Sequence, residues 1–424
     1  MSQPALARGL SPVRAVLDNG VVAIVQENRT APAVAINATF SAGSVREPES
    51  LPGLAYLTGL TIDRGAWSRT PEAIAQELDD RGVALRVLVT RHAFTLSCTC
   101  LSEDFTGILS LLSEITRRPA FPEVELEKRR GEAITAVRQD ADSTSVRATE
   151  GVLELLYGKN HPYARPAKGT VDTLEAMRRA DLAEFHARHL VPAALRVVIV
   201  GDMQPSQALD AVATRFGGWQ GPEPEAEIVP PPPQPGRQAR AIPMPGKSQA
   251  DIAYGFTAIR RLDPRYYAYW VMNNILGQFG LGGRLAENIR EEQGMAYYAF
   301  SSFDGTVGEG PLLIRAGVDP VNVRRALAAI DSEVEKLHRQ GPTVDEVEEN
   351  RESLIGSIPR MSETNDGIAE FLQNAERFGL GLDHDRRLGG LLRDVRFEDV
   401  RQAAREALDP ERAAYAVAGP DVDP

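Results

Sequence analysis

The chain has 424 residues, of which 43% are hydrophobic, a composition typical of a soluble globular protein that is too long for one ordinary core. Lysine and arginine number 47 against 59 aspartate and glutamate residues, which gives a net charge of −12 and disfavours a nucleic-acid partner bound through its phosphates. The two cysteines, Cys98 and Cys100, are one residue apart in a predicted strand, so they favour neither a disulfide framework nor a cysteine-type zinc site.

The chain contains no predicted membrane span. No segment approaches the ~18 uninterrupted apolar residues that a span needs, and the N-terminal stretch MSQPALARGLSPVR lacks a long apolar core. We therefore expect a soluble protein, with the cytoplasm favoured. A periplasmic location is the alternative if a signal peptide has been removed and replaced by a methionine.

The first half of the chain mixes predicted strands with pairs of helices. Residues 15–40 predict β-structure around an Asn19-Gly20 turn, with a second turn near Arg29 to Pro32. In chain order, the further predicted elements are helices over 51–62 and from Pro71 onward behind a Thr70 cap, strands over 83–89 and 92–101, helices over 105–117, 122–139, 146–157 and 181–189, and a short buried strand over 195–200.

A proline-rich stretch separates the two halves. The sequence GPEPEAEIVPPPPQPG, around Pro222 to Pro235, disfavours regular pairing and predicts an extended, semi-rigid linker. A ligand for a signalling module is the less favoured alternative. The predicted division is an N-terminal domain over 1–220, a linker over 221–240 and a C-terminal domain over 241–424.

The second half repeats the first. Three positions recur at an offset of 218 residues, namely Asp181, Pro192 and Gly201 in the first half and Asp399, Pro410 and Gly419 in the second. The tripeptide Glu-Val-Glu at 123–125 recurs at 346–348, an offset of 223 that implies a small insertion. Two copies of one α+β unit are therefore predicted, each a mostly antiparallel sheet with helices on one face.

The stretch from Gly277 to Tyr298, GQFGLGGRLAENIREEQGMAYY, combines a glycine-rich loop, a charged helix and an aromatic strand. Strong helix formers predict a helix from Arg284 to Gln293, which Gly294 ends, and a strand follows from Met295 to Phe303. The loop glycines, which can adopt positive φ, are Gly277, Gly280, Gly282 and Gly283. A dinucleotide fingerprint would need a glycine at Leu285, and no Gly-Lys-Ser/Thr follows, so a nucleotide site is disfavoured.

Two residues of this stretch are candidate functional residues. On the sequence alone, Arg290 is explained as a solvated helix cation that pairs with Glu287, and Tyr297 as an aromatic side chain packed in the core. A functional interpretation of the pair needs support from the rest of the chain.

Motifs along nearly the whole chain resemble a known family. They are LDNGVVAIV, GSVREPESLPGLAY, HPYARPAKGT, the ending P…VVIVGD of the first half, and GGRLAENIREEQGMAYY, which is the most specific. The chain resembles the insulinase-like (pitrilysin) zinc metallopeptidases, which include mitochondrial processing peptidase and the respiratory core proteins. The resemblance implies two similar α+β domains, and an assembly in which two such pairs close around a peptide chamber.

The zinc motif of that family is degenerate in this chain. Active members carry His-x-x-Glu-His on a helix, in which the two imidazoles bind zinc and the glutamate is the base for the attacking water. In the matching segment, GLAYLTGLTIDRG, Tyr56 and Leu60 stand at the histidine positions and Gly59 stands at the glutamate position. The resemblance therefore implies no zinc site of this type here.

No other pattern in the sequence replaces the lost zinc ligands. In the helix that carries the family's distal glutamate, Ala136 falls near that position and Glu132 lies about one turn away. Glu184, His186 and His189 form E-x-H-x-x-H, with histidines that could share a helix face but no carboxylate between them. We expect no metal in this chain.

A second part of the family's active site is retained. In active members an arginine and a tyrosine seven residues later, on the second domain, bind the substrate's backbone carbonyl, and Arg290 and Tyr297 match this spacing. The resemblance implies a non-catalytic subunit of a heterodimer, whose homologous partner carries an intact His-x-x-Glu-His motif and the zinc and cleaves peptides. The alternatives are a structural or binding subunit of the core-protein type, and a peptidase that acts alone through an unrecognised metal site.

Overall fold

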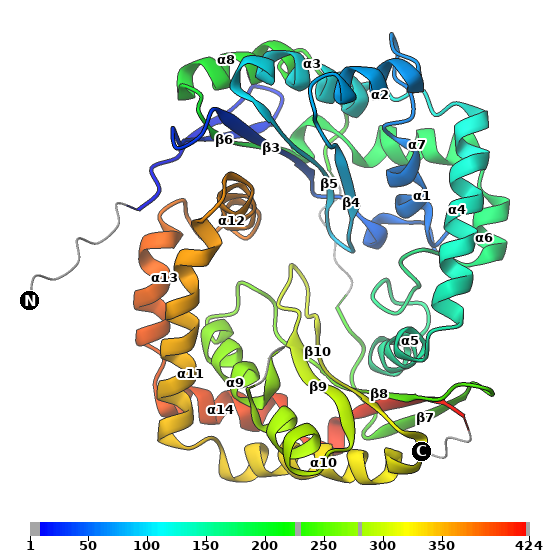
Figure 1. Cartoon of the computed structure of the whole chain (residues 1–424), viewed down its shortest axis with the longest axis vertical. Helices are drawn as coiled ribbons and strands as arrows, with labels where there is room; N and C mark the ends of the chain where they lie inside the picture. Colours follow the sequence, from blue (N-terminus) through cyan, green and yellow to red (C-terminus); the bar gives the residue numbers. More distant parts are fainter. Residues whose placement is uncertain (1–8, 225–229, 279–281, 421–424) are drawn as a thin grey trace, which may run out of the picture. The chain divides into compact units, whose positions relative to one another are not determined.

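The computed structural model describes residues 9–224, 230–278 and 282–420, which form two compact units (Figure 1). Unit 1 takes its described residues from Met1–Thr135, Ala167–Glu227 and Ser357–Gly389. Unit 2 takes its described residues from Ala136–Pro166, Ile228–Gly356 and Gly390–Pro424. Each unit therefore contains a segment from the other half of the sequence.

Unit 1 is built on a six-stranded sheet in the order β1-β2-β6-β3-β5-β4. Its strands are β1 (Val13–Val16), β2 (Val22–Glu27), β3 (Ala33–Phe40), β4 (Arg86–Val89), β5 (Phe94–Leu101) and β6 (Leu195–Gly201). The predicted hairpin around Asn19-Gly20 is confirmed, because β1 and β2 pair antiparallel with Val16 opposite Val22. Strands β2 and β3 do not pair with each other, since β6 lies between them, parallel to β2 and antiparallel to β3.

Unit 2 repeats this topology without the first strand. Its sheet has the order β7-β11-β8-β10-β9, so β7 and β11 form the parallel pair and the other neighbours are antiparallel. The strands are β7 (Gln238–Pro243), β8 (Ala250–Thr257), β9 (Ala296–Phe303), β10 (Pro311–Val318) and β11 (Ala414–Gly419). The predicted repeat of a mostly antiparallel α+β unit is confirmed.

Each half covers one face of its own sheet with its own helices. In unit 1, α1 (Leu54–Thr61), α3 (Phe105–Arg117) and α8 (Pro205–Phe216) contact the strands, and α7 (Arg179–His189) packs on α1. Helix α2 (Pro71–Asp79) belongs to the same half. In unit 2 the helices are α9 (Tyr266–Gly277), the π-helix η4 (Ala286–Glu292), α10 (Val323–Gln340) and α14 (Phe397–Ala407). The remaining helices are α4 (Glu123–Ala141), α5 (Thr144–Tyr157), α6 (Val171–Ala176), α11 (Val344–Ser357), α12 (Asn365–Arg377) and α13 (His384–Arg393).

The opposite face of each sheet is covered by a helix from the other half of the sequence. Helix α12 lies across β3 and β6 of unit 1, on the side away from α3 and α8 (Figure 1). Its apolar residues Ile368, Ala369 and Leu372 are buried against strand residues that include Ile24 and Val198. The central strands are apolar on both faces, so both faces need a cover.

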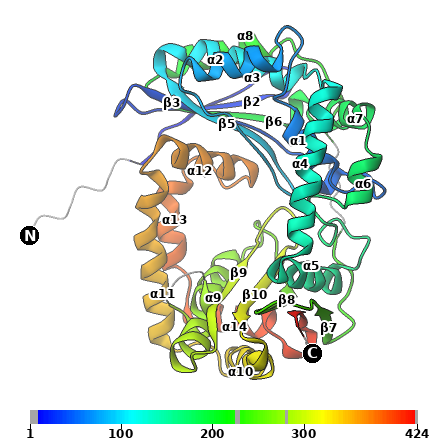
Figure 2. The same cartoon turned by 45° about the vertical axis from the view of Figure 1, so that its right-hand side comes forward.

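Helix α5 does the same for unit 2. It packs on β8, β11 and β7, with α10 and α14 on the other side of the sheet (Figure 2). The approach is close, because a Cβ at Gly151 would lie 2.8 Å from Ile242 Cδ1 and 2.9 Å from Ala416 Cβ. Helices α5 and α12 occupy equivalent places in the two halves. Each comes from one half of the sequence and covers the sheet of the other half, so we call them the exchanged helices.

The repeated positions have matching structural roles. Asp181 accepts a hydrogen bond from the Arg178 backbone N–H at 2.6 Å, at the start of α7. Asp399 accepts the equivalent bond from Arg396 at 3.0 Å, at the start of α14. A carboxylate at a helix N-terminus satisfies otherwise unpaired amides, which explains why an aspartate stands at this place in both halves.

The described residues of the predicted linker over 221–240 form no helix or strand before Gln238, where β7 begins. Residues 225–229 of this stretch lie outside the described residues. The predicted domains over 1–220 and 241–424 differ from the two compact units in two segments. Ala136–Pro166 belongs to unit 2, and Ser357–Gly389 belongs to unit 1.

Candidate functional site

The candidate arginine lies on the π-helix η4 in unit 2. The predicted helix from Arg284 to Gln293 is present as one α-helical turn that widens into η4, with the Gln293 amide bonded to the Asn288 carbonyl five residues back, at 3.1 Å. Departures from α-helical to π-helical geometry occur frequently at functional sites. Gly294 has φ of +60° and ends the element, as predicted.

Side-chain contacts attach this helix to α10 and α11. Arg284 donates to both carboxylate oxygens of Glu346, at 2.7 and 2.8 Å, and this hydrogen bonding raises the pKa of Arg284. The Asn288 amide donates to Glu333 at 2.7 Å. A two-point guanidinium–carboxylate pair is geometrically specific, so η4 has a defined place on unit 2.

Gly277 and Gly283, on either side of the glycine-rich loop before η4, lie close together. A Cβ at Gly283, where φ is +96°, would lie 2.6 Å from the Gly277 Cα. Both positions therefore need the small size and left-handed freedom of glycine. Gly282 is exposed in open space, and the predicted loop residue Gly280 lies outside the described residues.

The candidate tyrosine stands at a β-bulge. Strand β9 pairs with β10 in regular register up to Tyr298, opposite Gly317, but the next pair joins Ala296 to Val318. Tyr297 is thus the extra residue of the bulge, a feature that re-aims a side chain. Its side chain is 85% exposed, so the alternative explanation of Tyr297 as an aromatic packed in the core is wrong.

Arg290 is also accessible. Its side chain is 39% exposed, and its nearest ion pair joins Nε to Glu291 Oε1 at 3.5 Å, in place of the expected pair with Glu287. Such an exposed, long pair contributes little to stability. One turn therefore connects two exposed hydrogen-bond donors, a guanidinium and a phenol.

The degenerate zinc motif lies on α1 in unit 1, and the glutamate position has no room for a side chain. A Cβ at Gly59 would lie 2.6 Å from Val89 Cγ2 and 3.6 Å from Val87 Cγ1, both on β4. The helix surface that would present the catalytic base is packed against the sheet. Tyr56 and Leu60, at the histidine positions, are half-buried, and Leu60 has no atom that can bind a metal.

The remaining zinc candidates do not assemble either. Glu132 on α4 forms an ion pair with Arg129 at 2.6 Å. Ala136 on the same helix offers no ligand atom. Within residues 9–224, 230–278 and 282–420, no group of three or more His, Cys, Asp or Glu side chains is placed to hold a metal ion. The residues present at the family's zinc position therefore do not fit the metal.

The two histidines of E-x-H-x-x-H contact different surroundings. His186 Nε2 lies 2.7 Å from the Thr116 carbonyl of α3, and burial lowers the pKa of His186 despite this contact. His189 is buried against Phe185, with ring centroids 4.9 Å apart. Because the two rings serve different contacts, they do not form a shared site.

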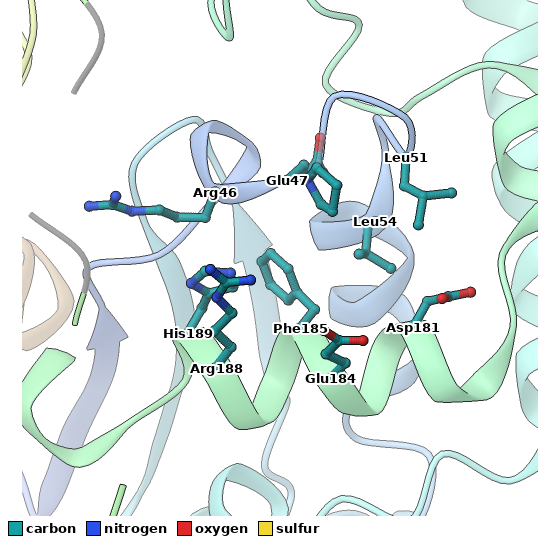
Figure 3. Close-up of a pocket in the computed structure, with 10 residues that line it drawn as sticks. Arg46, Glu47, Leu51, Leu54, Asp181, Glu184, Phe185, Arg188 and His189 are labelled. Atoms are coloured by element: carbon teal, nitrogen blue, oxygen red, sulfur yellow. The ribbon is translucent and has the colours of Figure 1, made fainter. Parts of the chain in front are cut away.

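A pocket of about 260 Å³ lies between α7 and the segment from Arg46 to Leu54 in unit 1 (Figure 3). His189 and Glu184 line it from α7, but His186 does not. The buried Glu47 accepts hydrogen bonds from the Gly53 and Ala55 amides, at 3.0 and 2.8 Å, at the start of α1. Glu47 thus anchors the helix that carries the degenerate motif.

The fold agrees with comparisons to known proteins. The insulinase (peptidase M16) family profile matches residues 22–170, and the profile described as the peptidase M16 inactive domain matches residues 176–354. The chain belongs to the insulinase, or peptidase M16, family. The inactive-domain description applies to residues 176–354 and not to residues 22–170.

Relatives span most of the chain. An uncharacterized zinc protease of Bacillus subtilis, YmxG, is 24% identical over 345 residues, with 81% of this chain and 83% of that protein covered. A protein of Helicobacter pylori named non-peptidase homolog YmxG is 23% identical over 406 residues, with 94% and 91% covered. The crystal structure of a peptidase M16 inactive domain from Pseudomonas fluorescens superposes with a TM-score of 0.90 at 24% identity, over 97% of this chain and 98% of that one. This structure has the same fold.

Among the described residues, no helix combines the length and the apolar character needed to cross a membrane.

Proposed function

We propose that this chain is the non-catalytic subunit of a heterodimeric peptidase, and that Arg290 and Tyr297 bind the substrate's peptide backbone at the active site of a homologous partner. The partner carries the intact His-x-x-Glu-His motif and the zinc. The observation that carries the proposal is the exposure of Tyr297 at a β-bulge next to the helix of Arg290.

The chemistry of the pair suits this role. A guanidinium and a phenol both donate hydrogen bonds, and a peptide carbonyl accepts them. Donors aimed at an oxygen that gains negative charge during hydrolysis stabilise the transition state. The donors come from an anchored π-helix and from a bulge between two paired strands, so little backbone conformational entropy is lost when substrate binds.

The packing of α1 supports the proposal that this chain binds the substrate while the partner supplies the base and the zinc. Gly59 packs on Val89, so this chain has no space for the base that activates water. A partner must supply the base and the metal if peptide hydrolysis occurs. The peptide substrate would then contact both chains.

Reconstitution tests the proposal. The chain is co-expressed with a homologue that has His-x-x-Glu-His, the complex is isolated by size exclusion, and hydrolysis of unstructured peptides and the zinc content are measured for each chain and for the complex. The proposal predicts zinc in the partner and hydrolysis that requires both chains. Failure to form a complex, or equal hydrolysis by the partner alone, would contradict it.

A structural or binding subunit without a role in proteolysis is the second candidate. It is favoured by the relative in Helicobacter pylori that is named a non-peptidase homolog. This candidate predicts a stable complex whose peptide hydrolysis does not change when Arg290 or Tyr297 is substituted. The variant measurements below therefore separate the two functions.

A further inference from the structure

A row of three residues crosses the sheet of unit 2 directly beside the bulge. Gly317 on β10 is opposite Asp251 on β8 and opposite Tyr298 on β9. The Tyr298 hydroxyl donates a hydrogen bond to Asp251 Oδ1. The tyrosine thus reaches across the middle strand to a carboxylate two strands away.

Glycine in the middle of the row makes this contact possible. A Cβ at Gly317 would lie 2.5 Å from Tyr298 Cε1, so the aromatic ring occupies the space of the missing side chain. No positive φ requires glycine at this position, so the requirement comes from the ring. An aromatic side chain that covers a glycine on the neighbouring strand is a known way to pin strand register.

The carboxylate of Asp251 is buried and has several donors. Its exposed fraction is 1%, and the Gln249 side-chain amide donates to it at 3.1 and 3.2 Å. Thr144, the first residue of the exchanged helix α5, donates its hydroxyl to Oδ2. The N-terminus of α5 favours a negative charge at this place.

Tyr298 is therefore bound on the α5 side of the sheet. Burial and the bond to Asp251 raise the pKa of Tyr298 well above its usual range, so the phenol remains a donor. Ser145 of α5 lies 3.5 Å from the same hydroxyl. The bulge lies at the preceding residue, Tyr297, which has no pairing partner on β10.

We propose that Asp251 and Tyr298 are positioning residues for Tyr297: the cross-strand contact over Gly317 holds the register on one side of the bulge and so keeps the Tyr297 phenol exposed. The exchanged helix α5 takes part through Thr144. This inference rests on the proposed function for its catalytic consequence, but the positioning itself belongs to this chain alone.

The positioning is tested by fluorine NMR on the full chain labelled with 3-fluorotyrosine. The Tyr297 resonance is assigned by its loss in Tyr297→Phe. We expect it to shift in Tyr298→Phe, which removes the donor, and in Gly317→Ala, which displaces the ring and removes no polar group. Tyr415→Phe is the matched control, because it removes a tyrosine hydroxyl on β11 of the same sheet. An unchanged Tyr297 resonance in both test variants, with thermal unfolding still cooperative, would overturn the proposal.

The catalytic consequence is measured in the reconstituted complex. We expect Tyr298→Phe to lower kcat/KM for peptide hydrolysis by about 10-fold, because a small misplacement of a substrate-binding group is costly, whereas Tyr415→Phe leaves it unchanged. A shifted resonance with an unchanged rate would overturn the catalytic consequence if Tyr297→Phe does lower the rate. An unchanged rate in Tyr297→Phe would instead contradict the proposed function, while the NMR result still decides the positioning.

Discussion

At the residue scale, packing against the sheet closes the glutamate position of the degenerate motif on α1. Gly59 lies in the middle of a helix, where alanine would ordinarily be more stable, and it is tolerated because the helix touches Val89 at this point. The close packing replaces the space that a catalytic glutamate would need. A glutamate side chain at position 59 would therefore disrupt the packing between α1 and β4 in unit 1.

A matched pair of glycine substitutions tests this packing. We expect Gly59→Ala to destabilise unit 1 by about 1–3 kcal/mol through overpacking against Val89. Gly131→Ala, on α4 with open space around its Cβ position, should stabilise the chain by about 0.5–1 kcal/mol. Urea unfolding measures both. A stabilising Gly59→Ala would show that the helix can move away from the strand. No recovery when Val89→Ala is added would show that contact with Val89 is not the cause of the loss.

His92 should make the stability of the chain depend on pH. Burial, together with the charges of Arg377, Arg91 and Arg46, lowers the pKa of His92 to about 3. The unfolded chain binds a proton near pH 6.5 and the folded chain does not, so stability falls as the pH decreases from about 7 towards 3.

The contribution of His92 is isolated by a neutral substitution. Between pH 8 and pH 5, we expect the free energy of unfolding of the unmodified chain to fall by about 2 kcal/mol relative to His92→Gln, which has no such proton to bind. Urea titrations at several pH values give this difference. A difference between the two proteins that stays constant with pH would contradict the expectation.

At the scale of elements, the exchanged helix α12 is part of the core of unit 1. Leu372 is fully buried with residues of β2, β3 and β6. Truncation of a buried leucine leaves a cavity, so we expect Leu372→Ala to cost about 2–5 kcal/mol. Glu370→Ala, on the exposed face of the same helix, should change stability by less than about 0.5 kcal/mol.

Hydrogen exchange locates this effect. Leu372→Ala should raise the exchange rates of amides in β3 and β6, because these strands lose part of their cover. Similar protection in Leu372→Ala and Glu370→Ala would mean that α12 does not stabilise the sheet of unit 1.

The elements themselves were predicted well where local patterns decide them. The Asn19-Gly20 hairpin, the Thr70 cap, the helix over 105–117 and the buried strand over 195–200 are present, because turn chemistry, capping and periodicity act within a few residues. The repeat at an offset of 218 predicted two copies of one α+β unit, because equal spacing of matching residues indicates equal elements in both halves.

Tertiary contacts explain what the sequence did not predict. The exchange of α5 and α12 depends on long-range packing, and an apolar helix face does not show which sheet it covers. The bulge at Tyr297 depends on a pairing partner that lies about twenty residues away in the chain. The sequence feature that could have indicated the bulge is Gly317, because a glycine inside a strand often marks a bulge or the close approach of another group to the backbone.

At the scale of the whole molecule, the chain contains the proposed substrate-binding pair but lacks the base and the histidines of the family's zinc motif. Unit 2 presents Arg290 and Tyr297 on anchored elements, whereas α1 of unit 1 has no base and does not fit zinc. Members of one family can share a fold and differ in activity, so the function of this chain follows from its site. Peptide hydrolysis at the proposed site would need a base and a zinc ion from a second chain.

The most direct test is the value of kcat/KM for peptide hydrolysis by the reconstituted heterodimer with Arg290→Ala in this chain. The control is Arg339→Ala, which removes an exposed arginine from α10 of the same unit. Loss of a donor to the reacting carbonyl should lower kcat/KM by about 100-fold in Arg290→Ala, with an intact complex and unchanged zinc content. Equal kcat/KM values for the two complexes would contradict the account.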